Sequence, residues 1–375
     1  MQDDFPVEDF LNSPPIYDEP SDTDSDDEFE NDIINKSYHL RLQHRKIMKK
    51  FSINTLEFFD AGGFGEIHLG RTIKNGCVTD EKIAVKLLEA PSLDIVSLKK
   101  WRRACKREMY YIHQLNEHEN VVNIFDYYWL YNPEQQQHPA YLAIKFEHLE
   151  ISLDKCIDEG FDFNFQTIGK IATQIGSAIE YMHEKKIVHH DIKPENIMIA
   201  KFDDQEKKKI NNQTIFKLID FGLARQAREK VGIKWLENRA GCGTIPYMCE
   251  EMLNSFGSYN PYLADSYAFG ATLLHIVMGD SFSNQIEALF ASGVYQQFLI
   301  DTWTRPDLET YLTHPHYLKA IGDLLKPQTE RPFVFQVLPM FHNDTTCPIE
   351  EHLVQPDGGW PIPGDSFSRL CRSIH

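Results

Sequence analysis

The chain has 375 residues, 42% hydrophobic and 25% charged, which is long enough for two compact lobes or one large α/β domain with a tail. Its formal net charge is −18, from 38 Lys and Arg against 56 Asp and Glu, which argues against a nucleic-acid-binding surface over the whole protein. The seven cysteines are odd in number, scattered and never spaced as C-x-x-C pairs, so the pattern disfavours a disulfide framework or a zinc site and favours a reducing compartment.

Targeting segments are not expected. The first ten residues hold four acids and no basic residue, unlike a secretory signal or a transit peptide. The longest apolar stretch, Ala268–Gly279, contains a His and is shorter than the roughly 20 residues that a membrane span needs. We expect a soluble, cytoplasmic protein with nuclear access left open, no membrane span and no direct contact with nucleic acid.

The acidic charge belongs to one end of the chain. Residues 1–35 hold 13 acids and no Lys or Arg, so the other 340 residues carry 43 acids and 38 bases, a net charge of −5. Such a segment buries too little apolar surface to offset its ordering entropy, and we expect a disordered acidic tail. Ser21, Thr23 and Ser25 each have an acid three residues later, as in sites of acidophilic kinases, although a solubilising tail explains them as well. Residues 36–50 are basic and predict a short lead-in helix.

Two differently patterned regions follow. Residues 51–147 alternate β-rich runs (53–59, 66–71, 82–88 and 141–146) with one helical stretch, 97–116, and predict a small sheet with a helix. Residues 148–340 predict a mainly helical lobe, with helices at 165–183, 264–278 and 317–325 and short strands at 196–199 and 215–219. Residues 341–375 are rich in Pro and Gly and predict an irregular C-terminal tail.

Three short motifs occur in the first region. The run Asp60-Ala-Gly-Gly-Phe-Gly-Glu-Ile67 places glycines between two strands, where backbone N–H groups can approach a phosphate chain, although most such hairpins are plain turns. Lys86 ends the strand motif Ile-Ala-Val-Lys, and Glu108 follows on the predicted helix. A lysine on an apolar strand needs a charge partner, and Glu108 can supply it.

The second region adds Ile-Val-His-His-Asp-Ile-Lys-Pro-Glu-Asn at 187–196 and Asp-Phe-Gly at 220–222. In this order the motifs resemble the eukaryotic protein kinase family over residues 51–340. The resemblance implies an α+β, bilobal protein kinase fold with a β-rich N-lobe (51–147) and a helical C-lobe (148–340). Gly243–Glu251 resembles the end of an activation segment, and Asp265 with Gly270 opens a buried helix. Arg331 would pair with Glu251.

The resemblance also implies the chemistry, phosphoryl transfer from ATP with Mg²⁺ to a hydroxyl of a protein substrate. Lys86, positioned by Glu108, would hold phosphates, Asp191 would orient the acceptor hydroxyl, and Lys193 would face the γ-phosphate. Asn196 and Asp220 supply hard oxygen ligands for Mg²⁺. The predicted nucleotide-binding residues are Ala61, Gly62, Gly63, Phe64, Gly65, Ile67, Ala84, Lys86, Lys145, Glu147 and Met198, with Ile144 behind the adenine slot and Lys145–Glu147 as the hinge strand.

Three departures from the family pattern bear on activity. Asp60 replaces the first loop glycine, His190 replaces the arginine before the catalytic Asp, and Cys249-Glu250-Glu251 replaces Ala-Pro-Glu. A neutral His cannot make the bidentate contact by which that arginine docks a phosphate. No Ser, Thr or Tyr lies between Phe221 and Gly243, so we expect activity without phosphorylation of the activation segment. Redox control through Cys242 and Cys249 is the less favoured idea.

Several alternatives stay open. Lys193 and Thr244 resemble serine/threonine members, with tyrosine or dual specificity as the lesser alternative. The rival from another class is a pseudokinase, a binding or scaffolding protein, and a third option is a small-molecule phosphotransferase. The helix at 97–116 carries a dense basic face on which the acidic tail could dock and move Glu108. The basic residues are Lys99, Lys100, Arg102, Arg103, Lys106 and Arg107.

Overall fold

The computed structural model describes residues 43–62, 65–91, 95–131, 139–201, 210–211, 213–227, 242–253, 259–279 and 315–341. The chain divides into two compact units. The first contains the residues up to Arg103 together with Ile124–Glu147, and the second contains Ala104–Asn123 together with the residues from His148 onward. Across these described ranges, no helix combines the length and apolar character needed to cross a membrane. The predicted acidic tail and C-terminal tail lie outside the described residues.

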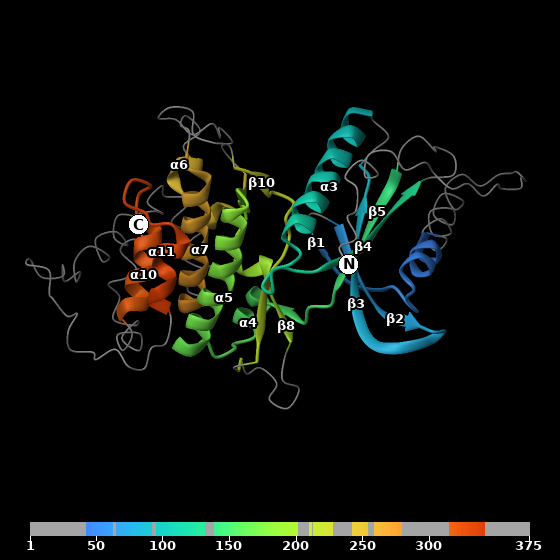
Figure 1. Cartoon of the computed structure of the whole chain (residues 1–375), viewed down its shortest axis with the longest axis horizontal. Helices are drawn as coiled ribbons and strands as arrows, with labels where there is room; N and C mark the ends of the chain where they lie inside the picture. The colour runs from blue at the N-terminus through green and yellow to red at the C-terminus, as the bar shows by residue number, and fades with distance from the viewer. Residues whose placement is uncertain are drawn as a thin grey trace, which may run out of the picture. The chain divides into compact units, whose positions relative to one another are not determined.

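The first unit is built on a five-stranded antiparallel sheet, shown in blue and green in Figure 1. The strand order is β1-β2-β3-β5-β4, with β1 at Glu57–Gly62, β2 at Gly65–Lys74, β3 at Cys77–Glu89, β4 at Ile124–Tyr131 and β5 at Pro139–Glu147. Asn75 and Gly76 close the β2–β3 hairpin with φ of 53° and 79°, the left-handed conformation that a two-residue hairpin turn requires. The predicted strands at 66–71, 82–88 and 141–146 are confirmed, and β1 begins four residues later than expected.

A helix over residues 43–51 packs on one face of this sheet, in agreement with the predicted basic lead-in helix, whose residues 36–42 lie outside the described part. Its apolar positions Ile47 and Phe51 are only 1% and 3% exposed. They form one core with residues from three strands, namely Ile83, Val85, Leu87, Leu130 and Ala143. Burial of two large side chains of this kind stabilises the unit by roughly 3–6 kcal/mol. The helix is therefore part of the folded unit.

Helix α3 (Ile95–Leu115) follows β3 and confirms the helix predicted at 97–116. The boundary between the two units falls within it, after Arg103. Its apolar side chains Leu98, Met109, Ile112 and Leu115 are buried, whereas its first half presents basic residues to solvent.

The second unit is mainly helical. Helices α5 (Phe165–Glu184) and α7 (Pro261–Met278) pack against each other, and α10 (Pro315–Leu325) packs on α7, as Figure 1 shows in green, gold and red. Gly270 makes this second contact possible, because a Cβ atom there would lie 2.7 Å from the Cβ atom of Leu324. Asn164 and Asn260 cap α5 and α7 through their side chains, as expected for asparagine before a helix. The three predicted helices are confirmed.

Short elements complete this unit. Two small sheets have the orders β6-β8-β9 and β10-β7, with β6 at Ile151–Ser152, β7 at Ile187–Val188, β8 at Ile197–Lys201, β9 at Ile215–Leu218 and β10 at Arg225–Gln226. The short helices are α4 at Leu153–Asp158, η1 at Pro194–Asn196, η2 at Ile245–Tyr247, α6 at Glu250–Leu253, α11 at Val334–Val337 and η5 at Leu338–Phe341. The β-rich first unit and the helical second unit agree with the predicted α+β kinase fold.

Candidate active site

The loop after β7 is held by one buried carboxylate. The two oxygens of Asp265, on α7, accept hydrogen bonds from the backbone N–H groups of His189 at 2.8 Å and His190 at 2.9 Å. The Nε2 atom of His183 lies 3.0 Å from the same carboxylate. Burial alone would raise the pKa of Asp265, but the hydrogen bond and charge of His183 outweigh it, so this pKa lies below its ordinary value. The carboxylate on α7 therefore holds the first residues of the loop in place.

His189 joins this loop to the strand end that carries Asp220. Its Nδ1 atom accepts a hydrogen bond from the backbone N–H of Asp191 at 3.3 Å, which leaves Nε2 to donate to the carbonyl of Ile219 at 3.1 Å. An imidazole that accepts at one nitrogen and donates at the other is neutral. Burial is the main cause that lowers the pKa of His189, in agreement with this tautomer. His189 thus fixes the spacing of the loop and the Asp-Phe-Gly motif.

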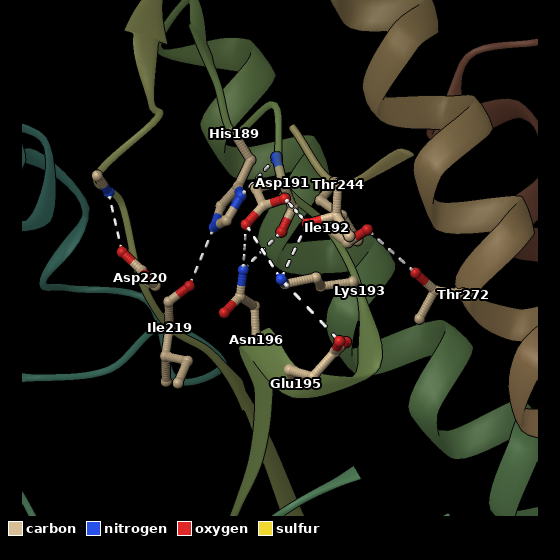
Figure 2. A network of polar contacts seen from close by, with 11 residues as sticks. His189, Asp191, Ile192, Lys193, Glu195, Asn196, Ile219, Asp220, Thr244 and Thr272 are labelled. Atoms are coloured by element: carbon tan, nitrogen blue, oxygen red, sulfur yellow. Dashed lines mark hydrogen bonds and ion pairs between the residues drawn. The ribbon is translucent and has the colours of Figure 1, made fainter. Parts of the chain in front are cut away.

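Asp191 lies at the centre of the polar network in Figure 2. Its Oδ1 atom accepts a hydrogen bond from the hydroxyl of Thr244 at 2.8 Å, and its Oδ2 atom accepts one from the amide of Asn196 at 2.9 Å. The ammonium of Lys193 donates to the Thr244 hydroxyl at 2.9 Å and lies 3.7 Å from Oδ2 of Asp191. The carboxylate is only 6% exposed yet has several donors, so it is held in one orientation.

Asn196 and Asp220 fit the donor chemistry of Mg²⁺. The Nδ2 atom of Asn196 is used by Asp191, and its amide oxygen is turned away from that carboxylate in Figure 2. Asp220 has the left-handed φ of 58°, and one of its oxygens accepts from the backbone N–H of Gly222 at 3.2 Å. Within the described residues, no group of three or more His, Cys, Asp or Glu could hold a metal ion by itself. Mg²⁺ commonly takes only one or two protein ligands together with phosphate oxygens, so this pair suits it.

His190, which stands where the family has arginine, is buried in the second unit. Its Nε2 atom lies 3.4 Å from the hydroxyl of Tyr259, and the two rings meet edge to face with centroids 6.2 Å apart. His190 is 5% exposed and Tyr259 is 1% exposed. The imidazole therefore packs inside the protein instead of presenting a donor to solvent.

The end of the Gly243–Glu251 segment is anchored by the predicted ion pair. The Nη2 atom of Arg331 lies 3.4 Å from both carboxylate oxygens of Glu251, while its Nε and Nη1 atoms donate to the carbonyls of Lys326 and Leu263. The prediction that Arg331 pairs with Glu251 is confirmed. Beside it, burial is the main cause that raises the pKa of Cys249 to about 12, so this thiol stays protonated and is a poor redox site.

In the first unit, one face of the sheet carries the predicted phosphate-binding residues. Ile67 pairs with both Asp60 and Lys86, and Lys86 also pairs with Ile144, so the four side chains share a face. Asp60 is half-buried there, with Oδ1 bonded to its neighbour's backbone N–H at 2.9 Å. Gly65, at φ 125°, approaches β3 so closely that a Cβ atom would clash with the carbonyl of Leu87.

The remaining nucleotide-site predictions lie on several different elements. Ala84 lies two residues before Lys86 on the same face, and Met198 is half-buried on β8 of the second unit. Lys145 lies on the opposite face, where its Nζ atom donates to the carbonyl of Phe51 at 3.1 Å, so only its backbone is left for a hinge role. Glu147 ends β5, and Ala61 and Gly62 end β1. The predicted residues Gly63 and Phe64 lie outside the described residues.

Lys86 and Glu108 are both buried charged residues, 9% and 5% exposed. Lys86 belongs to the first unit and Glu108 to the second. Their ion pair stays a prediction.

Sequence reasoning missed two partners in this site. His183 was not connected with Asp265, and Tyr259 was not connected with His190. The first could have been inferred, because an Asp in a buried helix requires hydrogen-bond donors, and a His lies six residues before the loop that begins at His189. Nothing in the sequence points to Tyr259 as the partner of His190.

Comparisons of the sequence with known proteins agree with this motif content. The sequence profile of the family described as "Protein kinase domain" matches residues 55–331. The chain is 29% identical to "Probable serine/threonine-protein kinase MARK-A" of Dictyostelium discoideum over 68% of this chain and 20% of that protein. It is 26% identical to "Myosin light chain kinase family member 4" of Mus musculus over 63% and 54% of the two chains. It is also 26% identical to "Aurora/IPL1-related protein kinase 2" of Caenorhabditis elegans over 61% and 65%. The chain thus spans less than two thirds of the length of each of these relatives.

Proposed function

Because this chain belongs to the protein kinase domain family, we propose that it is a protein serine/threonine kinase that transfers the γ-phosphate of ATP to a hydroxyl of a protein substrate. The observation that carries the proposal is the environment of Asp191. Its carboxylate is buried, oriented by Asn196 and Thr244, and lies near the ammonium of Lys193. Such an arrangement suits alignment of an acceptor hydroxyl next to a fixed positive charge.

We assign the following roles in the reaction to residues of this chain. Asn196 and Asp220 would hold Mg²⁺, which would neutralise phosphate oxygens of the ATP that supplies the phosphoryl group. Asp191 would orient the acceptor hydroxyl and take its proton as the new P–O bond forms, while the bond from the γ-phosphorus to the bridging oxygen breaks and ADP leaves. Lys193 offsets the negative charge that develops on the transferred group, and Thr244 keeps this ammonium beside the carboxylate.

The first unit would supply most of the residues that contact the nucleotide. Lys86, positioned by Glu108, would bind the α- and β-phosphates, and the hairpin Ala61–Gly65 would place backbone N–H groups against the triphosphate. The adenine would lie among Ile67, Ala84 and Met198, bonded to the backbone of the hinge strand Lys145–Glu147. We assign the kinase domain to residues 51–340, divided into lobes at 147, with the acidic and C-terminal segments outside it.

Serine and threonine are the proposed acceptors. The relatives' names and the contact between Lys193 and Thr244 support this choice. The described cysteines, Cys77, Cys105, Cys156, Cys242 and Cys249, are all free thiols, which supports action in the reducing cytoplasm.

We also propose that activity does not depend on phosphorylation of the activation segment. The imidazole of His190 packs on Tyr259 inside the second unit, and an imidazole so placed cannot make the bidentate contact with a phosphate that an arginine makes. If phosphatase treatment removed a phosphate from this segment and abolished activity, the proposal would be wrong.

The test is transfer of labelled γ-phosphate to generic protein acceptors and to the chain itself. Asp191→Asn and Lys193→Met should each abolish transfer, and Lys319→Gln, on the exposed side of α10, should retain it. Nucleotide binding is measured in parallel by thermal shift. Binding without transfer in the unmodified chain would refute the enzyme assignment in favour of the alternative, a pseudokinase that acts as a binding or scaffolding protein.

A further inference from the structure

The first half of α3 carries four basic side chains that have no counter-charge in the described part of the chain. Lys99, Lys100 and Arg103 are exposed, and Arg102 is half-buried with its Nε atom shielded from solvent. None of the four makes an ion pair or hydrogen bond with any residue that the structure describes. We call these four residues the α3 cation patch.

The basic face predicted from the sequence is thereby reduced from six residues to four. Arg107 donates to the carbonyl of Gly222 at 3.3 Å, and Lys106 also has interactions within the protein. These two residues follow the unit boundary, whereas the four patch residues all belong to the first unit. Lys106 and Arg107 are therefore engaged within the protein, whereas the four patch residues have no such partner among the described residues.

The positive charges of the patch destabilise the helix that carries them. Lys99 repels Arg102 and Arg103, and Lys100 repels Arg103, because residues three and four apart are neighbours on a helix surface. The first turn of α3 contains no acidic residue, so the positive end of the helix dipole adds to this repulsion instead of offsetting it. Each like-charge pair destabilises the helix slightly. A bound anionic segment would offset both the repulsion between these side chains and their unfavourable interaction with the helix dipole.

The chain contains such a segment. Ser21–Glu28 holds five acids in eight residues, and no Lys or Arg occurs in residues 1–35. The 14 residues from 29 to 42 connect this run to the helix at 43–51, which belongs to the same unit as the patch. Fully extended, 14 residues reach about 46–50 Å. A tether of this length keeps the acidic run at an effective concentration on the order of millimolar.

We propose that the acidic run Ser21–Glu28 docks on the α3 cation patch of the same molecule. Docking is charge-driven, so it weakens as salt shortens the screening length from about 10 Å at 0.1 M to about 3 Å at 1 M. It also stabilises the first half of α3. This binding does not depend on the proposed phosphotransfer, and its test uses no activity measurement.

The test is carbodiimide crosslinking of the dilute full chain, which joins a carboxylate to a contacting lysine amine with loss of water. Mass spectrometry should map amide links from the acidic run to Lys99 or Lys100, and these links should disappear at high salt. Replacing Arg102→Gln and Arg103→Gln together leaves both lysines in place and should reduce the links several-fold. The matched control replaces two exposed cations of the helix at 43–51, Arg45→Gln and Lys49→Gln, and should leave the links unchanged.

Hydrogen exchange gives a second measurement on the full chain. Replacing the acids of the run with Asn and Gln should speed amide exchange in the first half of α3 and leave α5 unchanged. Three results would each overturn the proposal. They are links spread over all exposed lysines, links insensitive to the two arginine substitutions, and links that form only between two molecules as concentration rises.

Discussion

Replacing Asp265 with Asn should loosen the catalytic loop at its anchor. The carboxylate accepts three hydrogen bonds, at 2.8, 2.9 and 3.0 Å, two of them from backbone N–H groups. Whichever way the amide turns, its NH₂ group faces the backbone N–H of His189 or His190, donor against donor. One hydrogen bond to a charged group is lost, about 1.5–3 kcal/mol, and one buried N–H is left unsatisfied, about 1–3 kcal/mol. We expect the free energy of unfolding to fall by about 2.5–6 kcal/mol.

Urea unfolding followed by circular dichroism measures this loss, and phosphotransfer under conditions where the variant is folded measures its effect on the loop. Asp323→Asn serves as the control, because the ion pairs of Asp323 within the described residues are with Lys319 and Lys326 at the surface, and surface pairs contribute about 0–1 kcal/mol. If Asp265→Asn were as stable and as active as this control, the anchoring role of the carboxylate would be refuted.

Three further predictions concern other parts of the molecule. Arg331→Met should cost about 3–5 kcal/mol in urea unfolding, and less when Glu251→Gln is also present, because Arg331 is the cation beside the half-buried Glu251 carboxylate; additive losses would contradict this. Burial and the nearby His68 lower the pKa of His44 below its ordinary value of 6.5, so the unfolded chain binds the proton more readily and stability falls as pH drops below about 6.5. His44→Gln should flatten this slope in denaturant midpoints, and an unchanged slope would count against it. Asp60→Asn should lower the KM for ATP by about two- to tenfold, since Asp60 shares a sheet face with Lys86, and an equal KM would place its charge away from the triphosphate.

Long, regular patterns in the sequence predicted their elements well. Helices α5 and α7 have a cap residue, apolar periodicity and sufficient length, and their predicted positions agree with the structure within a few residues. Strand β4 was missed because Ile-Phe-Asp-Tyr-Tyr-Trp-Leu-Tyr has neither clean alternation nor a turn signal, and only Leu130 in it is buried. Its place in the sheet comes from pairing with β5, a contact that a local pattern cannot report.

In the candidate site, too, the sequence motifs predicted some features and could not predict others. Asp191, Lys193, Asn196 and Asp220 were named from motif order, and the structure brings the first three into one hydrogen-bonded network with Thr244. Lys145 shows the limit of motif reasoning, because strand register decides which face a side chain occupies, and its ammonium binds Phe51 on the face opposite Lys86.

Because of the helix at 43–51, the folded domain starts earlier in the chain than the family match does. The family match begins at residue 55, yet Ile47 and Phe51 cover the sheet face formed by Ile83, Val85 and Ala143. A fragment cut at the family boundary would expose this apolar strip to water and leave the ammonium of Lys145 without its carbonyl partner. The shortest piece of this protein suited to expression in isolation therefore begins at or before residue 43, and pieces that lack this helix should aggregate.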